Sequence, residues 1–524
     1  MAAEAAMAAA RRVLSIQSHV VHGYVGNRAA VFPLQLLGFE VDVINSVHFC
    51  CHTGYPSFTG QKLDGDDLHS MLEGMSTNGV LNHSHLLTGY IGTASFLREV
   101  VQLRRRLPAA SRYICDPVMG DNGQLYVSRE LVDVYREEVL PHVTILTPNQ
   151  FEAELLVGST IGSLDDATRA CDVLHHMGPS TVVITTLDVP DATLGGQRVA
   201  LLLSEAGRRK WLLRVPLIEG GPFTGTGDLT AAMLLAWTQM HPHEAPEALE
   251  KAGAVLQAVL RRTVSLGSAR MVGEKRVPPE LRIIDCKRSI ESPAVSVRCS
   301  LLEPLGLRGV VFDMDGTLTL PGQIDFARMR ERVGVPAGDI VTGLRERHAQ
   351  DPAALAEAMA QVEEEERRAF DPPQLQPGLQ ECIRDLLGAG IRVGLATRNG
   401  PSCVEALLRH AELPPGAFSP VLTRDSGLPS KPDPAPVLHC CKEWGVEPSS
   451  VLMVGDHPDD LRCGRAAGSL TAAMLWPGAV PSEDEADAAR MQALAKRGEA
   501  NAALAELADF PLSSLGALRR LVGS

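Results

Sequence analysis

The segment GGPFTGTGDLTAAMLLAW at residues 220–237 places four glycines directly before an unbroken apolar run. Glycines in such a turn let backbone N–H groups converge on an anion at the start of a helix, where the helix dipole adds positive potential. Asp228 stands inside this turn. A carboxylate there could simply cap the helix, so the rest of the chain must decide whether the turn is a phosphate site.

Short β-branched runs recur upstream of this turn, with helical patterns between them. The runs are VLSIQS (13–18), VDVINSV (41–47), HLLTGY (85–90), RYICDP (112–117), VTILTPN (143–149) and STVVITTL (180–187). This alternation predicts an α/β fold with a largely parallel sheet that helices cover on both faces. Because such sheets bind ligands at the carboxyl ends of their strands, we expect the functional side chains where the runs end.

Polar side chains do follow several of these runs. They are Asp116, Asn149, Glu152, Thr185 and Thr186. With Asp228 they supply what phosphoryl transfer needs: acidic groups for Mg²⁺, donors to phosphate oxygens and a base for the attacking hydroxyl. The Gly-x₄-Gly-Lys-Ser/Thr and His-Arg-Asp motifs are missing from the sequence, which excludes P-loop and protein-kinase sites. The set therefore predicts a kinase for a small alcohol.

Longer motifs make this prediction more specific. They are SIQSHVVHGYVGNRAAVFPLQLLGFEVD (15–42), NSVHFCCHTGY (45–55), LLTGY (86–90), CDPVMGD (115–121), TPNQFEAELL (147–156), MGPSTVVIT (177–185) and GTGDLTAAMLLAW (225–237). Over about residues 11–302 the sequence resembles the eukaryotic pyridoxal kinase family of the ribokinase-like superfamily. The related hydroxymethylpyrimidine kinases share the glycine-rich turn and the base, but the SIQSHVVHGYVGN and HTGY segments favour pyridoxal.

The resemblance implies roles for the matching residues. Asp228 would be the general base, beside an anion hole formed by Gly225, Thr226 and Gly227. The residues that hold the pyridine ring would be Ser18, Thr53 and Tyr90. Those that serve ATP and its metal would be Asp116, Thr147, Asn149, Glu152, Thr185 and Thr186, with Asp116 and Glu152 as metal ligands and Tyr126 as a lid. The stretch NGQL between Asp121 and Tyr126 is shorter than we expect of the family's lid loop.

A second series of apolar runs begins after the Pro- and charge-rich stretch 277–303. Its strands are predicted at GVVF (309–312), RVGLA (392–396) and VLMV (451–454). We therefore predict a kinase-like domain at 1–302, a short linker at 303–307 and a second α/β domain at 308–524.

The motif VVFDMDGTLT (310–319) opens this second domain with Asp313 and Asp315 at a strand end, where Gly316 favours a turn. An acidic surface turn would explain the motif alone. Other strand ends and loops add a matching set of residues: Thr397 and Asn399 in ATRN, Lys431 in SKPDP, and Asp456 and Asp460 in GDHPDD. Closely spaced like charges need a cation, and oxygen ligands suit Mg²⁺.

These four motifs resemble the haloacid dehalogenase-like superfamily over about residues 307–524, which implies a Rossmann-like fold. Asp313 would attack phosphorus and become an aspartyl-phosphate, and Asp315 would protonate the leaving oxygen and then activate water. Thr397, Asn399 and Lys431 would bind the substrate. The metal would be held by Asp313, the carbonyl of Asp315 and Asp456, with Asp460 steadying the site. These features favour a phosphatase or a phosphomutase over a dehalogenase.

The insert between the first two motifs resembles the small helical cap of that superfamily, at about 318–377. Amphipathic helices are predicted within 324–370, and the run EEEERR (363–368) is interpreted as a solvated helix face. Caps set substrate specificity, so the phosphatase substrate stays open.

The composition of the chain limits the kinds of partner that we expect it to bind. The net charge of −14 disfavours a nucleic-acid partner, and the absence of a long apolar run argues against a membrane span. The eleven cysteines show no disulfide or zinc spacing, and we expect a cytoplasmic protein with small-molecule substrates. The resemblance further implies ATP, Mg²⁺, a monovalent cation such as K⁺ and a homodimer through the kinase half.

The leading hypothesis is a bifunctional enzyme in which an ATP-dependent pyridoxal kinase is joined to a Mg²⁺-dependent phosphatase that could act on a B6 phosphate. Three alternatives stay open. The phosphatase could have an unrelated substrate, the C-terminal half could sense B6 phosphates without turnover, or the kinase half could mainly carry its product.

Overall fold

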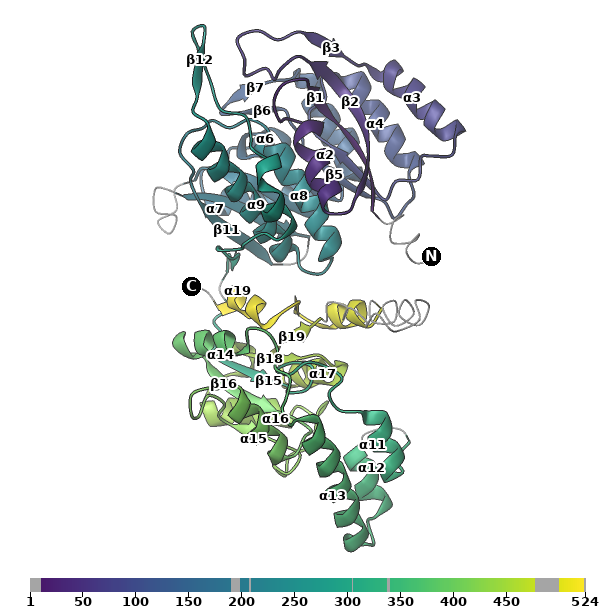
Figure 1. The fold of residues 1–524 in the computed structure, drawn as a ribbon, viewed down its shortest axis with the longest axis vertical. Coiled ribbons are helices and arrows are strands. Elements are labelled where there is room, and N and C mark those ends of the chain that lie inside the picture. The colour runs from purple at the N-terminus through teal and green to yellow at the C-terminus, as the bar shows by residue number, and fades with distance from the viewer. Residues whose placement is uncertain are drawn as a thin grey trace. The chain divides into compact units, whose positions relative to one another are not determined.

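The computed structural model of the chain describes residues 11–189, 198–206, 209–303, 305–336, 340–475 and 499–522. The chain divides into two compact units, Met1–Glu303 and Pro304–Ser524 (Figure 1). In the described part of the chain, no helix is long and apolar enough to cross a bilayer.

The N-terminal unit is built on a ten-stranded sheet in the order β14-β11-β10-β9-β8-β5-β4-β1-β2-β3. The strands are β1 (Arg12–Val20), β2 (Glu40–Phe49), β3 (Gly60–Lys62), β4 (His85–Thr88), β5 (Arg112–Cys115), β8 (Ile145–Leu146), β9 (Thr181–Leu187), β10 (Arg198–Glu205), β11 (Lys210–Pro216) and β14 (Ser300–Leu301). The strands from β9 to β2 pair in parallel. Antiparallel strands extend both edges. The predicted parallel core is confirmed.

Helices form two layers around this sheet (Figure 1). In one layer α8 (Thr226–Met240) contacts α2 (Asn27–Leu36) and α9 (Ala245–Leu266). The other layer contains α3 (Gly65–Thr77), α4 (Ala94–Arg106), α5 (Arg129–Val134), α6 (Gln150–Val157) and α7 (Leu164–His176). Shorter elements are the hairpin β12 (Arg270–Val272) and β13 (Lys275–Val277), and α10 (Lys287–Glu291). Residues Leu229–Thr238 of α8 are buried, which explains why this helix is apolar on all sides.

The C-terminal unit has an all-parallel six-stranded sheet in the order β17-β16-β15-β18-β19-β20. Its strands are β15 (Gly309–Phe312), β16 (Arg392–Ala396), β17 (Val421–Leu422), β18 (Val451–Gly455), β19 (Leu470–Met474) and β20 (Phe510–Leu512). The helices beside it are α14 (Leu379–Gly388), α15 (Pro401–His410), α16 (Ala435–Trp444), α17 (Pro458–Ala467) and α19 (Arg519–Val522). The predicted Rossmann-like arrangement is confirmed.

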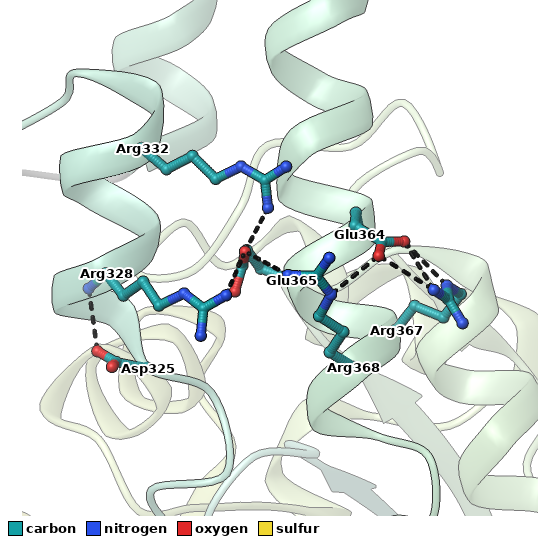
Figure 2. A network of polar contacts seen from close by, with 7 residues as sticks. All are labelled: Asp325, Arg328, Arg332, Glu364, Glu365, Arg367 and Arg368. Atoms are coloured by element: carbon teal, nitrogen blue, oxygen red, sulfur yellow. Dashed lines mark hydrogen bonds and ion pairs between the residues drawn. The ribbon is translucent and has the colours of Figure 1, made fainter.

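Three helices form the insert that follows β15: α11 (Phe326–Val333), α12 (Ile340–Arg347) and α13 (Pro352–Ala369). Figure 2 shows Glu365 of α13 facing Arg328 and Arg332 of α11, and Glu364 facing Arg367 and Arg368. The interpretation of the run 363–368 as a solvated face is wrong for Glu365 and Glu366, which are 8% and 3% exposed. Arginines on neighbouring elements bury these carboxylates by pairing with them.

Candidate active sites

The first candidate site lies at the start of α8. Gly225 precedes the helix with a φ of 88°, and a Cβ atom there would lie 2.0 Å from the carbonyl oxygen of Tyr24. Only glycine fits this close approach and this left-handed conformation. One turn on, Asp228 accepts a hydrogen bond from the Gly26 N–H. Burial raises the pKa of Asp228, and the Gly26 N–H opposes that rise.

Two further carboxylates lie near this turn. Asp116 follows β5 and is 5% exposed, and burial, with the charges of Glu152 and Asp228, raises its pKa well above the usual range. Glu152 accepts hydrogen bonds from the N–H groups of Met119 (3.0 Å) and Asn149 (2.9 Å). Burial nevertheless raises the pKa of Glu152 to about 8. A bound cation would offset this concentration of buried acidic groups, so Asp116 and Glu152 fit a role in holding a metal.

The predicted ATP-binding residues lie at neighbouring strand ends. Thr147 is buried and its N–H donates to Cys115 O at 3.0 Å, while the hydroxyl of Thr185 donates to Pro148 O at 3.3 Å. Asn149 caps α6, and its side-chain amide donates to Gly120 O at 2.8 Å. Thr186 at the end of β9 is exposed. The side chains of Thr147, Thr185 and Asn149 therefore lie around one edge of the sheet.

The predicted lid is a tight hairpin. Strands β6 (Gly120–Asp121) and β7 (Gln124–Leu125) are joined by Asn122 and Gly123, which have φ values of 49° and 75°. Positive φ at both central residues is typical of the two-residue turns that match strand twist. Tyr126 follows β7 and is 55% exposed, so its ring is available to a ligand.

The three predicted ring-binding residues differ in their burial and in their contacts. Ser18 is 9% exposed near the end of β1, and a Cβ atom at Gly26 would lie 2.4 Å from its hydroxyl. Tyr90 packs against a small apolar cluster that includes Val20 and Phe49. Thr53 is exposed in the loop after β2, and its carbonyl accepts from Lys275 at 3.3 Å. Ser18 therefore lies close to the loop that contacts Asp228.

The second candidate site lies at the carboxyl end of the C-terminal sheet. Lys431 pairs with Asp313 and, at 2.6 Å, with Asp460. Asp313, Asp456 and Asp460 present carboxylate oxygens within 4.8 Å of one another. Gly316 has a φ of 74°, and a Cβ atom there would lie 1.9 Å from Asp456 Oδ2, so the turn needs glycine to reach this carboxylate.

The electrostatics of this cluster fit a cation. Burial, together with the neighbouring carboxylates, raises the pKa of Asp456 to about 8. Burial likewise raises the pKa of Asp313 to about 6, although Lys431 opposes the rise. Crowded oxygen ligands of this kind are typical of Mg²⁺ sites. Asp313 and Asp456 therefore fit a role as ligands of the Mg²⁺ ion that the sequence implies. Asp460 also pairs with Lys431.

Asp315 and the predicted phosphate-binding residues lie close to this cluster. Burial raises the pKa of Asp315 to about 7, and its carboxylate accepts a hydrogen bond from the Asn399 amide at 2.5 Å. Thr397 directly follows β16, where it is 7% exposed, and its hydroxyl accepts from the Asn399 N–H at 3.1 Å. A carboxyl group with a pKa near neutrality can both donate and accept a proton at ordinary pH.

A buried ion pair joins the cap to this site. Glu366 of α13 pairs with Arg424, and both side chains are 4% exposed. Glu366 also accepts from the Gly400 N–H at 3.4 Å and the Cys403 thiol at 3.6 Å, both at the start of α15. The pair therefore links a cap helix to the loops that follow β16 and β17.

We expect Glu366→Gln to destabilise the C-terminal unit by about 3 kcal/mol, because it leaves the buried Arg424 without its closest counter-charge. Urea unfolding of the full chain, followed by loss of phosphate release, measures this. Glu363→Gln is the matched control, because Glu363 is 57% exposed and lies 3.6 Å from the same arginine. Its effect should stay within about 0.5 kcal/mol. Equal effects of the two substitutions would show that burial of the Glu366 pair is unimportant.

Known proteins resemble both units. A phosphomethylpyrimidine kinase family model matches residues 78–273. Pyridoxal kinase from Sus scrofa is 47% identical over 309 residues, which cover 56% of this chain and 95% of that protein. The pyridoxal kinase from Arabidopsis thaliana is 48% identical over 295 residues, which cover 55% and 93%. The chain belongs to the pyridoxal kinase family.

A solved structure and a second family model extend this assignment. Pyridoxal kinase from Leishmania donovani in complex with ADP and pyridoxine matches with a TM-score of 0.52 and 37% identity, over 56% of this chain and all of that chain. A haloacid dehalogenase-like hydrolase model matches residues 307–468. The pyridoxal kinase unit is thus followed by a hydrolase unit of the haloacid dehalogenase-like type.

Several contacts in the two units have no counterpart in the sequence analysis. In the pyridoxal kinase unit, Glu280 accepts from the Tyr24 N–H at 3.2 Å and the Tyr55 hydroxyl at 2.9 Å, and it pairs with His52 at 3.2 Å. It ties the HTGY segment to the loop before α2 from outside every motif, so no sequence signal marks it. In the hydrolase unit, Arg398 lies within the ATRN motif and pairs with Asp459 at 2.7 Å. Its position in the motif, directly after Thr397, could have identified it as a candidate site residue.

Proposed function

We propose that the chain phosphorylates pyridoxal with ATP in its N-terminal unit and hydrolyses a phosphomonoester in its C-terminal unit. The kinase assignment is supported by identity to pyridoxal kinases along nearly their whole length. The observation that carries the hydrolase assignment is the cluster of Asp313, Asp456 and Lys431 beside Asp315, because it contains a nucleophile, a metal site and an acid-base group. A module that only senses phosphates would not need this complete set.

In the kinase unit, Asp228 would accept the proton of the substrate hydroxymethyl group as its oxygen attacks the γ-phosphorus of ATP. Backbone N–H groups of Gly225, Thr226 and Gly227 would stabilise the charge on the transferred phosphoryl group. Ser18, Thr53 and Tyr90 would hold the ring. The raised pKa of Asp228 and its position in the first turn of α8, at the positive end of the helix dipole, support this role.

The co-substrate would lie along the neighbouring strand ends. Residues assigned to ATP are Thr147, Asn149, Thr185, Thr186 and Tyr126, and Asp116 and Glu152 would hold Mg²⁺. The related kinase from Leishmania donovani has been solved with ADP and pyridoxine, which supports both ligand classes here. We also propose a monovalent cation such as K⁺ and a homodimer through this unit, by analogy with the family.

In the hydrolase unit, Asp313 would attack phosphorus and form an aspartyl-phosphate while Asp315 protonates the leaving oxygen. Asp315 would then take a proton from the water that releases phosphate. Thr397 and Lys431 would bind the phosphoryl oxygens, and Asn399 would orient Asp315. Mg²⁺, held by Asp313, the Asp315 carbonyl and Asp456, would neutralise charge on the phosphoryl group.

Removal of Mg²⁺ tests both assignments at once. With the full chain we expect a chelator to stop ATP-dependent formation of pyridoxal 5′-phosphate and to stop phosphate release from p-nitrophenyl phosphate, and we expect added Mg²⁺ to restore both. Chelator saturated with Ca²⁺ beforehand, followed by excess Mg²⁺, controls for damage by the chelator itself. Phosphate release that persists without any divalent metal would refute the proposed hydrolase mechanism.

A further inference from the structure

A cavity of about 240 Å³ opens beside the predicted phosphate-binding residues of the hydrolase unit. Thr397 and Lys431 form part of its wall. Opposite parts of the wall come from the loop after β17, which contains Arg424, and from cap helix α12, which contains Arg345. The part of a substrate that leaves with its oxygen would therefore occupy a small space between the core and the cap.

The wall of this cavity is strongly cationic. The basic side chains that line it are Arg345, Arg398, Arg424 and Lys431. Residues with hydroxyl groups, including Thr423 and Ser426, also line it. Among the described residues that form the wall there is no carboxylate and no aromatic ring. A neutral leaving group would not require so many cations in so small a volume.

The partners of these cations show which of them can bind a ligand. Lys431 pairs with Asp313 and Asp460, and Arg398 pairs with Asp459. Arg424 is only 4% exposed, pairs with Glu366 and lies 3.6 Å from the exposed Glu363, yet its Nε has no hydrogen-bond partner among the described residues. A buried donor without a partner is unfavourable, so a ligand oxygen that reaches this guanidinium group would be bound favourably.

Arg345 is the second available cation. It is exposed on α12, and no ion pair joins it to any carboxylate in the described part of the chain. Because Arg345 belongs to the cap and Arg424 to the core, an anion between them would draw both parts toward one ligand. A guanidinium group suits planar, bidentate recognition of a carboxylate or a phosphate.

On the basis of the proposed phosphatase function, we infer that the hydrolase unit selects phosphomonoesters that carry a second anionic group near the scissile phosphate. That group binds Arg345 and Arg424. A carboxylate or a second phosphate shares this chemistry, and the cavity volume limits the substrate to a small molecule.

Pyridoxal 5′-phosphate fits this cavity poorly. Its ring would gain from an aromatic contact, but the two phenylalanines of the cap region lie elsewhere: Phe326 is 50% exposed, Phe370 is 1% exposed, and neither lines the cavity. The ring also carries no second carboxylate or phosphate. The product of the kinase unit is therefore not the preferred ester of the hydrolase unit.

A substrate panel with the full chain tests this inference. The esters are 2-phosphoglycolate and 3-phosphoglycerate, ethylene glycol bisphosphate, glycerol 3-phosphate as the neutral counterpart, pyridoxal 5′-phosphate and p-nitrophenyl phosphate. We expect kcat/KM for at least one doubly anionic ester to exceed that for glycerol 3-phosphate by about 10- to 100-fold. The carboxylate and bisphosphate arms identify which anion the cavity prefers.

Variants connect the preference to its proposed cause. Arg345→Gln is expected to lower the ratio of kcat/KM between the acidic and neutral esters by about tenfold, whereas Arg345→Lys, which keeps the charge but loses the bidentate geometry, should lower it by a smaller factor. Arg409→Gln, on the exposed surface of α15, removes the same charge away from the cavity and should leave the ratio unchanged. Because the measure is a ratio within one preparation, a partly unfolded sample does not alter it.

The outcomes separate this inference from the function on which it rests. Release from p-nitrophenyl phosphate without preference for an acidic ester overturns the inference and leaves the phosphatase standing. Pyridoxal 5′-phosphate as the best ester overturns it too, as does a ratio that Arg345→Gln does not change. No release from any ester overturns the phosphatase itself.

Discussion

Replacing Asp313 by Asn is expected to lower phosphate release by at least about 10⁴-fold, since an amide cannot attack phosphorus and no other carboxylate occupies the same position. The acid-stable phosphoenzyme that a quenched reaction would trap should disappear with it. Lys431 keeps its second partner, Asp460, at 2.6 Å, so the site should hold its shape. Phosphate release and radiolabel trapping measure the two effects.

The controls for this substitution use both units. Kinase turnover of Asp313→Asn should stay at the wild-type level, because Asp313 belongs to the C-terminal unit and Asp228 to the N-terminal one. Asp385→Asn makes the same change on α14, where the carboxylate is 49% exposed and pairs with Arg519, and it should preserve phosphate release. Near-normal release by Asp313→Asn would mean that water attacks phosphorus directly.

The sequence predicted the parallel core of each sheet better than its edges. Strong β-branched runs marked β1, β4 and β5, and each run forms a strand in the structure. The antiparallel strands β10 and β11 were not predicted from the sequence. Hydrophobic periodicity reports which residues are buried but carries no information about which strand a segment pairs with.

Strand ends were also a productive guide to the candidate sites. Because β15, β16 and β18 are neighbours in the sheet, the residues that follow them meet at one edge, and Asp313 and Asp456 lie together there. The buried pair of Glu366 and Arg424 escaped prediction for the opposite reason. Its carboxylate lies in a charged run that is typical of solvated helices, and only packing of the cap against α15 buries it.

Fusion of a kinase to a phosphatase raises a problem of energy use. If both units acted on pyridoxal 5′-phosphate, the chain would consume ATP with no net product. If the cationic cavity, whose described wall residues include no aromatic ring, selects a different ester as inferred above, the two reactions do not oppose each other. The substrate panel described above therefore also decides whether the fusion forms a futile cycle.

Replacing Asp228 by Asn is expected to lower kcat for pyridoxal phosphorylation by about 10²–10⁴-fold, because the amide cannot take the proton of the attacking hydroxymethyl group. Affinity for ATP should change little, since the predicted ATP-binding residues follow other strands. Steady-state formation of pyridoxal 5′-phosphate and equilibrium binding of ATP measure the two quantities.

The effects of this substitution on kcat and on stability together distinguish a catalytic base from a helix cap. If Asp228 were only a helix cap, Asp228→Asn would keep both the stability of the wild type and most of its kcat, because Asn caps helices about as well as Asp. The Asn side-chain oxygen can also accept the hydrogen bond that the Gly26 N–H donates to Asp228, so the loop that carries Gly26, next to Ser18, should keep its position. A large loss of kcat with unchanged thermal stability and unchanged phosphate release by the C-terminal unit is therefore the expected signature of a catalytic carboxylate. Retention of most of kcat would reduce Asp228 to a structural residue.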